Sequence, residues 1–217
     1  MNFLTLATCV VSVIVLIGAE WNQWARVRAV SKTVAAVSFF AYGVGLGALQ
    51  QGLGGTALVA GLGLSVVGDL CLLSKKNQTF KWGILSFLLA HVAYVVLFVA
   101  LGIHWLWAVT GGASVALLAL GVARFLAPFV QHMRLAVNGY IVVISVMVAF
   151  AIGMGAYDGN LDRVGLLISA VAFFLSDLCV ARERFVEPAF INKAFGLPLY
   201  FGAQLGFAWF GCQVLAG

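Results

Sequence analysis

Long apolar runs alternate with short polar segments along the whole chain, and eight of these runs are long enough to cross a bilayer. A hydrocarbon core of about 30 Å is spanned by about 20 helical residues, since each residue of an α-helix rises about 1.5 Å. The pattern predicts an all-α, polytopic membrane protein that folds as one domain over residues 1–217. The predicted transmembrane helices cover residues 3–19, 33–50, 56–73, 82–101, 105–123, 135–156, 161–181 and 194–215.

The amino-acid composition agrees with a membrane protein, because 64% of the residues are hydrophobic and only 9% are charged. Soluble domains carry about a quarter charged residues. The 25 glycines are spread through the apolar runs, where small residues let helices approach each other closely. The cysteines lie in apolar runs and form no CxxC pair, so we expect buried thiols rather than a disulfide or a zinc site. These cysteines are Cys9, Cys71, Cys179 and Cys212.

The basic residues gather in alternate connections between the predicted helices. All but one of the 12 lysines and arginines lie in or beside the first, third, fifth and seventh connections, and the exception is Arg163. Positive charge marks cytoplasmic loops, so we expect an inner membrane of bacterial type with both termini outside the cytoplasm. The net charge of +5 is then a sign of topology and does not indicate a nucleic-acid partner. The residues concerned are Arg26, Arg28, Lys32, Lys75, Lys76, Lys81, Arg124, Arg134, Arg182, Arg184 and Lys193.

Two aspartates inside apolar runs are the candidate catalytic residues. Asp69 lies near the end of the third predicted helix and Asp177 near the end of the seventh, each about 8 Å inside the cytoplasmic boundary. Ionisable groups inside a membrane are costly and mark functional sites. Two carboxylates at one depth can face one cavity, with one protonated and one ionised, which suits general acid–base catalysis. In the alternative interpretation, each carboxylate caps a helix end or pairs with a lysine.

Further polar side chains are predicted to lie in the cytoplasmic half of the bundle, whereas the outer half is almost entirely aliphatic and aromatic. This asymmetry suits a pocket that holds a lipid headgroup at the interface and its chain in the apolar half. His91 and Tyr94 are three residues apart and therefore share a helix face. The candidate substrate-binding residues are Lys32, His91, Tyr94, Asn138, Tyr140, Tyr200 and Gln204.

Several common reaction mechanisms have no matching pattern in the sequence. His91, His104 and His132 fall in different layers of the predicted bundle, so we expect no shared metal site. The chain contains no GxSxG elbow, HExxH pair or P-loop. We therefore expect neither a metal nor a cofactor.

A short internal similarity links the third and seventh predicted helices. Residues 68–72 read Gly-Asp-Leu-Cys-Leu, and residues 176–180 read Ser-Asp-Leu-Cys-Val. The two helices are four spans apart and run in the same direction across the membrane. A parallel repeat of two four-helix halves is one interpretation of this similarity.

The polar motifs resemble those of the lysoplasmalogenase family of membrane proteins, also called the YhhN family. The motifs occur in the expected order between Lys32 and Gln204, which is nearly the whole chain. One departure is Thr33, where many bacterial relatives have proline after the lysine. The motifs are Lys32, Gly68-Asp69 with Leu72, residues 87–94 (FLLAHVAY), residues 173–178 (FFLSDL), and Pro198-Leu199-Tyr200 with Gln204.

The resemblance implies hydrolysis of the vinyl ether bond of lysoplasmalogens, with lysoplasmenyl-ethanolamine or lysoplasmenyl-choline as the lysophospholipid substrate. The products are a fatty aldehyde and a glycerophospho-headgroup. Asp69 and Asp177 would supply the proton donor and the carboxylate that stabilises the cation, in an order that the sequence leaves open. His91, Tyr94 and Tyr200 would position water or phosphate, and Lys32 would pair with the phosphate. The surrounding membrane lipid is the other expected partner.

Two other classes of protein remain as alternatives at this stage. Paired carboxylates within a membrane also serve proton relays, so a proton-coupled transporter is one alternative. A lipid-binding membrane protein whose aspartates are structural is the other.

Overall fold

The computed structural model describes residues 2–74, 76–157 and 159–217, so Lys75 and the side chain of His132 lie outside the described residues. The described residues form eight long α-helices and three short helical segments. This confirms the predicted all-α class. The long helices are α1 (Asn2–Trp21), α2 (Ala25–Gly45), α3 (Gly52–Leu72), α4 (Asn77–Ala100), α5 (Trp105–Leu126), α6 (Arg134–Gly155), α7 (Leu161–Ala181) and α8 (Phe190–Ala216). The short segments are the 3₁₀-helices η1 (Ala48–Gln50) and η2 (Gln131–Met133) and the π-helix η3 (Arg182–Val186).

Six of the helices are long and apolar enough to cross a membrane, which identifies an integral membrane protein. They are α1, α3, α4, α5, α6 and α7, the last together with η3. α2 is less apolar because it begins with Arg26, Arg28 and Lys32, and α8 is less apolar because it contains Gln204 and Gln213. Eight transmembrane helices therefore stay a prediction, as does the parallel four-helix repeat.

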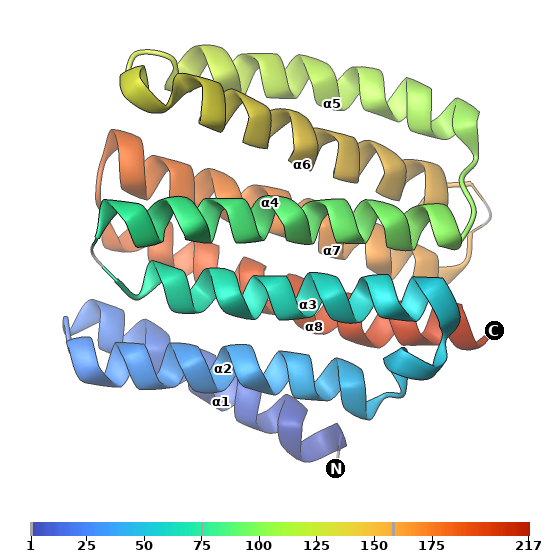
Figure 1. Cartoon of the computed structure of the whole chain (residues 1–217), viewed down its shortest axis with the longest axis horizontal. Helices are drawn as coiled ribbons and strands as arrows, with labels where there is room; N and C mark the ends of the chain where they lie inside the picture. The colour runs from blue at the N-terminus through green and yellow to red at the C-terminus, as the bar shows by residue number, and fades with distance from the viewer. Residues whose placement is uncertain (1, 75, 158) are drawn as a thin grey trace.

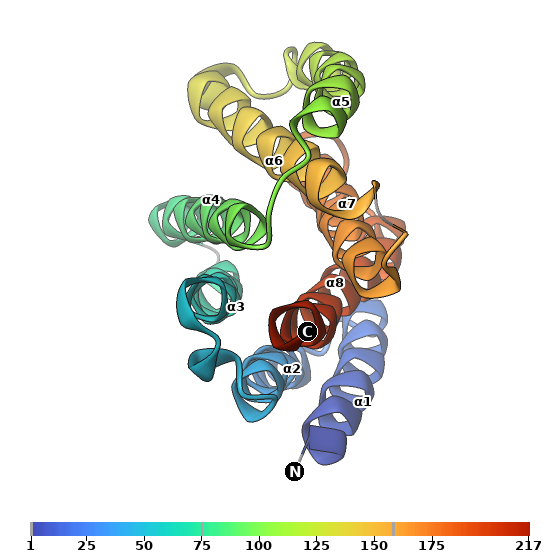
Figure 2. The ribbon, with the colours of Figure 1, turned by 90° about the vertical axis from the view of Figure 1, so that its right-hand side faces the viewer.

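The helix pairs α1–α2, α3–α4, α5–α6 and α7–α8 pack as antiparallel hairpins. α2, α3 and α4 lie side by side in one layer, with α1, α8 and α7 behind them (Figure 1). The view along the helices shows α6 beyond α4 and α7, with α5 at the outer edge of the bundle (Figure 2). α6 contacts both α4 and α7, and α8 contacts α1, α2, α3 and α7. The two layers thereby enclose one shared interior.

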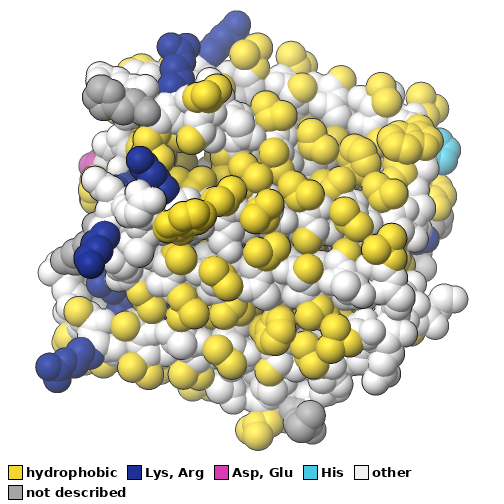
Figure 3. Space-filling model, viewed as in Figure 1, with side chains coloured by type: hydrophobic (Ala, Val, Ile, Leu, Met, Phe, Trp, Pro, Cys, Tyr) yellow, Lys and Arg dark blue, Asp and Glu magenta, His cyan; other side chains and the backbone are white. Residues whose placement is uncertain are grey.

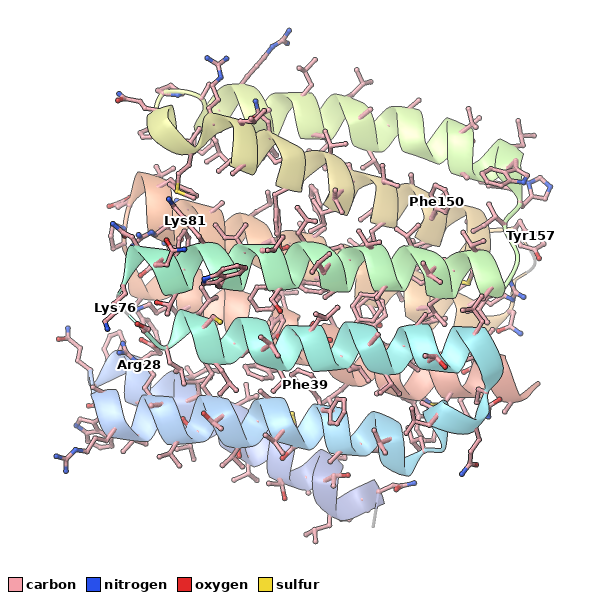
Figure 4. The ribbon with its side chains drawn as sticks, in the orientation of Figure 1. Arg28, Phe39, Lys76, Lys81, Phe150 and Tyr157 are labelled. Atoms are coloured by element: carbon pink, nitrogen blue, oxygen red, sulfur yellow. The ribbon has the colours of Figure 1, made fainter. Side chains whose placement is uncertain are left out.

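Four of the helix connections meet at one end of the bundle, and both termini lie at the other end (Figure 1). We call the first of these the basic end; its described residues are 22–24, 73–74, 76, 127–133 and 182–189 with the adjoining helix ends. Lysine and arginine side chains gather there (Figure 3), and Arg28, Lys76 and Lys81 are labelled at this end in Figure 4. Tyr157 lies at the opposite end (Figure 4).

Apolar side chains cover the sides of the bundle, as hydrophobic atoms do over much of the face shown in Figure 3. A hydrophobic surface of this extent is expected where the protein contacts lipid. The interior is filled largely by aromatic rings that are fully buried. These include Phe39, which Figure 4 labels between α2 and α3, together with Tyr94, Phe98, Phe173, Phe201 and Phe207.

Glycines set the close approach of α3 and α4. A Cβ atom added at Gly61 would lie 2.6 Å from the Tyr94 ring, and one at Gly68 would lie 2.6 Å from the Phe87 ring. No side chain larger than hydrogen fits between these rings and the α3 backbone. The α4 face that carries the predicted His91 and Tyr94 is thus pressed directly onto α3.

Gly61→Ala should therefore destabilise the protein by about 1–3 kcal/mol, because Tyr94 is fully buried and stacked on Phe207 and cannot give way. Thermal unfolding of the purified protein in detergent measures the effect. The matched control is Gly63→Ala on the same helix, where the nearest atom would lie 3.4 Å from the new Cβ. Equal melting temperatures for the two variants would contradict the close packing.

Candidate active site

A cavity of about 200 Å³ penetrates the bundle near the basic end. Its walls come from α2 through α8 and from η3, and most of them are apolar. Lys32, Asp69, Tyr140, Asp177 and Tyr200 line it together, so five of the predicted site residues share one cavity. Apolar lining residues include Phe80, Ile84, Val122, Leu126, Val137, Ile141, Ile144 and Phe174.

Asp69 is held by two donors from two other helices. The Lys32 ammonium of α2 lies 3.1 Å from Asp69 Oδ1, and the Tyr200 hydroxyl of α8 donates to Oδ2 at 2.7 Å. The Asp69 side chain is only 2% exposed, and an unpaired charge at such a position would be very costly. The predicted pairing of Lys32 with a substrate phosphate is not tested, but in this structure its partner is Asp69.

Asp177 has a different pair of neighbours. The Tyr140 hydroxyl of α6 donates to Asp177 Oδ2 at 2.7 Å, and His91 Nε2 of α4 lies 3.4 Å from the same oxygen. The carboxylate is partly exposed to the cavity. The two aspartates therefore face one cavity, but each is held by its own set of side chains.

His91 lies behind Asp177 and is completely buried. Its Nδ1 is 2.6 Å from the carbonyl oxygen of Phe87, one turn earlier on α4. Its ring packs against Phe173, with the ring centres 4.4 Å apart, and edge-on against Tyr140. Among the described residues, His91 Nε2 is the buried side-chain nitrogen or oxygen that has no hydrogen-bond partner.

Tyr94 and Gln204 lie deeper in the bundle than the cavity. The Tyr94 hydroxyl donates to Gln204 Oε1 at 2.6 Å, and Gln204 Nε2 donates to Ser65 Oγ at 3.1 Å. All three side chains are fully buried. This chain joins α4, α8 and α3 beneath Asp69, which lies one turn after Ser65 on α3.

Asn138, another predicted site residue, also lies outside the lining of this cavity. It lines a separate shallow groove between α5 and α6, with Ser145 and small apolar side chains. The groove and the cavity share Ile141, which lies between them on α6. A role for Asn138 in binding substrate stays a prediction.

Three polar residues at the mouth of the cavity were not predicted to belong to the site. Glu183 accepts hydrogen bonds from Asn192 Nδ2 at 3.0 Å and from the backbone of Ala189, and it lies 3.4 Å from Lys193 Nζ. Lys193 also donates to Glu20 at 3.0 Å. The sequence held a signal for Asn192 and Lys193, because both lie on the same face of α8 as the predicted Tyr200. The residues of this face that line the cavity are 192, 193, 196, 197 and 200.

The described residues contain no group of three or more His, Cys, Asp or Glu side chains that could hold a metal ion. The polar groups around the two aspartates are Lys32, two tyrosine hydroxyls and the buried His91 imidazole, with Glu183, Asn192 and Lys193 at the mouth of the cavity. Carboxylates with separate partners can take different roles in proton transfer.

The fold and the cavity together define an integral membrane protein whose helices enclose two acidic side chains in an apolar site. The profile of the YhhN family matches residues 27–210. The chain therefore belongs to the YhhN family, the family of lysoplasmalogenase-like membrane proteins, which confirms the resemblance seen in the sequence. No curated protein and no solved structure matches the chain.

Replacing Lys32 by methionine tests the Lys32–Asp69 pair. Lys32→Met leaves a buried carboxylate without its cation and should destabilise the protein by about 3 kcal/mol. The double variant Lys32→Met/Asp69→Asn should recover much of this loss, because it removes the charge as well. Thermal unfolding in detergent is the measurement, and Lys81→Met, an exposed lysine of the basic end, is the control. A stability of Lys32→Met equal to that of the wild type would contradict the pairing.

Proposed function

We propose that this protein hydrolyses the vinyl ether bond of lysoplasmalogens, releasing a fatty aldehyde and a glycerophospho-headgroup. Family membership supports a hydrolase of this class. The observation that carries the proposal is that Asp69 and Asp177 line one largely apolar cavity while each is held by different partners. In a lipid with one alkenyl chain, the vinyl ether bond lies where the apolar chain joins the polar headgroup. Polar side chains in an apolar cavity can contact the lipid at that point.

The cavity offers separate surroundings for the two ends of this substrate. Apolar side chains of α4, α5 and α6 form one wall, including Ile84, Leu126 and Ile141, and these suit the alkenyl chain. Lys193 and Asn192 lie at the mouth near the basic end and suit the phosphate. The vinyl ether would then lie between the two aspartates.

Cleavage of a vinyl ether needs one acid and one stabilising anion. Protonation of the β-carbon turns the double bond into an oxocarbenium ion, water adds to the cation, and the hemiacetal collapses to an aldehyde and an alcohol. Glycosidases use two carboxylates for a similar cation. We assign the same pair of roles to Asp69 and Asp177, with Tyr200 and Tyr140 orienting them.

Aldehyde release from lysoplasmenyl-ethanolamine by the purified protein is the direct test. We expect Asp69→Asn and Asp177→Asn each to lower turnover by at least about 100-fold, because a positioned acid or base contributes about 10²–10⁴. Both variants should remain folded in detergent. Glu187→Gln is the matched control, an exposed carboxylate of the basic end that lies outside the cavity lining and should keep full activity.

An ester-linked lysolipid serves as the substrate control and should release no product. Full activity in both aspartate variants would refute the mechanism. Absence of aldehyde with folded wild-type protein would refute the function, and proton-coupled flux across vesicles without chemical change would identify a transporter instead. Retention of lipid without turnover or flux would identify a lipid-binding protein.

We also propose that the basic end, and with it the mouth of the cavity, faces the cytoplasm of a bacterial cell. The distribution of lysine and arginine supports this orientation in the inner membrane. Among the described basic residues, Arg163 lies at the other end, over the Tyr157 ring. Both termini then lie outside the cytoplasm.

Reporter fusions made in a bacterial host test the orientation. A C-terminal alkaline phosphatase should be active, because it folds only outside the cytoplasm, and a C-terminal green fluorescent protein should be dark. A fluorescent protein inserted after Lys76, in the α3–α4 connection, should fluoresce and serves as the control. The reverse pattern would place the cavity mouth on the outer side.

A further inference from the structure

The strongest unexplained feature of the molecule is the second nitrogen of His91. Its first nitrogen, Nδ1, faces the carbonyl oxygen of Phe87 at 2.6 Å. A carbonyl oxygen has no hydrogen to donate, so Nδ1 must carry one. The tautomer of the ring is therefore fixed, and Nε2 either has a bare lone pair or carries a second proton that makes the ring a cation.

Nε2 lies 3.4 Å from Asp177 Oδ2 and has no hydrogen-bond partner. A bare nitrogen facing an ionised oxygen would place two lone pairs against each other in a fully buried position, which is strongly unfavourable. One proton on either atom removes this repulsion. Catalytic hydrogen bonds are often long in unliganded proteins and tighten when substrate binds, so a separation of 3.4 Å allows the contact.

Asp69 has the opposite surroundings. Both of its oxygens already accept from donors, one from the Lys32 cation and one from the Tyr200 hydroxyl. A proton on Asp69 would have to displace one of them. The two carboxylates are therefore distinguished by their neighbours. Asp69 faces the Lys32 ammonium, which keeps its proton, and Asp177 faces the His91 imidazole, which can share one.

We propose that His91 and Asp177 hold one proton between them and that Asp177 delivers it to the vinyl ether, whereas Asp69 remains the carboxylate that stabilises the cation. This inference rests on the proposed function and adds the order of roles that the sequence left open. His91 acts through Asp177 and does not line the cavity, so it is a positioning residue rather than a substrate-binding one.

The proton balance of the reaction closes on this pair. Asp177 gives its proton to the β-carbon, where the π electrons form the new C–H bond, and the resulting cation faces Asp69. Water adds to the cation and returns one proton to the Asp177–His91 pair. In the collapse of the hemiacetal the C–O bond to glycerol breaks, the hemiacetal hydroxyl loses a proton, and the glycerol oxygen gains one. The net reaction consumes one water and leaves the pair protonated.

Nitrogen NMR of protein labelled with ¹⁵N in its histidines tests the shared proton without any substrate. His91 is assigned by the signal lost in His91→Gln. Its Nε2 shift should differ from that of an unprotonated, unpaired imidazole nitrogen, and it should change in Asp177→Asn but not in Asp69→Asn. An Nε2 shift that is the same in wild type and Asp177→Asn would overturn the proposal, whether or not the protein releases aldehyde.

Kinetics of the full-length enzyme give the second readout. His91→Gln keeps a hydrogen-bond donor toward Asp177 but cannot share a proton, so kcat should fall about 100-fold while KM changes less than about threefold. His104→Gln, an exposed histidine at the opposite end, is the control and should match the wild type. A rise in KM with unchanged kcat would overturn the proposal in favour of substrate binding.

The two experiments separate the inference from the function on which it rests. A wild-type protein that releases no aldehyde but shows the NMR response refutes the proposed function and keeps the shared proton. A wild-type protein that releases aldehyde with no NMR response refutes the shared proton and keeps the function. If His91→Gln does not fold, His91 can be assigned by elimination from His104→Gln and His132→Gln, and the comparison of wild type with Asp177→Asn decides the question.

Discussion

A charged side chain inside an apolar helix bundle must find a partner of opposite charge, and the Lys32–Asp69 contact is where this protein meets that constraint most strictly. The carboxylate is almost completely buried, and its partners come from the preceding long helix α2 and from the distant α8. Satisfying Asp69 therefore requires α2, α3 and α8 to converge at one depth. The position of the cavity follows, because α2, α3 and α8 form one of its walls.

The helices and the two aspartates that line the cavity were predictable because they depend on local patterns. Apolar runs define helices, and an aspartate within such a run is conspicuous at any position. The partners were less predictable because they depend on contacts across the bundle: Tyr140 reaches Asp177 from another helix, and His91 reaches it from a third. Hydropathy carries no information on which helix faces are in contact.

Helix geometry alone indicates that Asn138 and Tyr140 cannot face the same cavity. Asn138 lies two residues before Tyr140, and residues two apart on a helix point in directions about 200° apart. Tyr140 faces Asp177, so Asn138 had to point elsewhere, and it lines the groove beside α5. The π-helix η3 was missed for a different reason, because Arg182, Glu183 and Arg184 interrupt the apolar run on which the predicted helix was based.

The two aspartates are held by helices that occupy corresponding positions in the two predicted four-helix halves. Asp69 of α3 receives Lys32 from α2 and Tyr200 from α8, while Asp177 of α7 receives Tyr140 from α6 and a contact with His91 of α4. Exchanging the two halves maps α2 onto α6 and α8 onto α4. Equivalent positions thus carry different residues, and this difference is what gives the two carboxylates unlike surroundings.

The glycines between α3 and α4 have a consequence beyond stability. Asp69 lies on α3 and His91 lies on α4. The separation of these two helices therefore sets the distance between the Asp69 carboxylate and the His91 imidazole. At Gly61 and Gly68 the α3 backbone packs directly against an aromatic ring of α4, which leaves no room for the helices to move closer. In the proposed mechanism, two glycines that take no part in the chemistry thus set the distance between two groups that do.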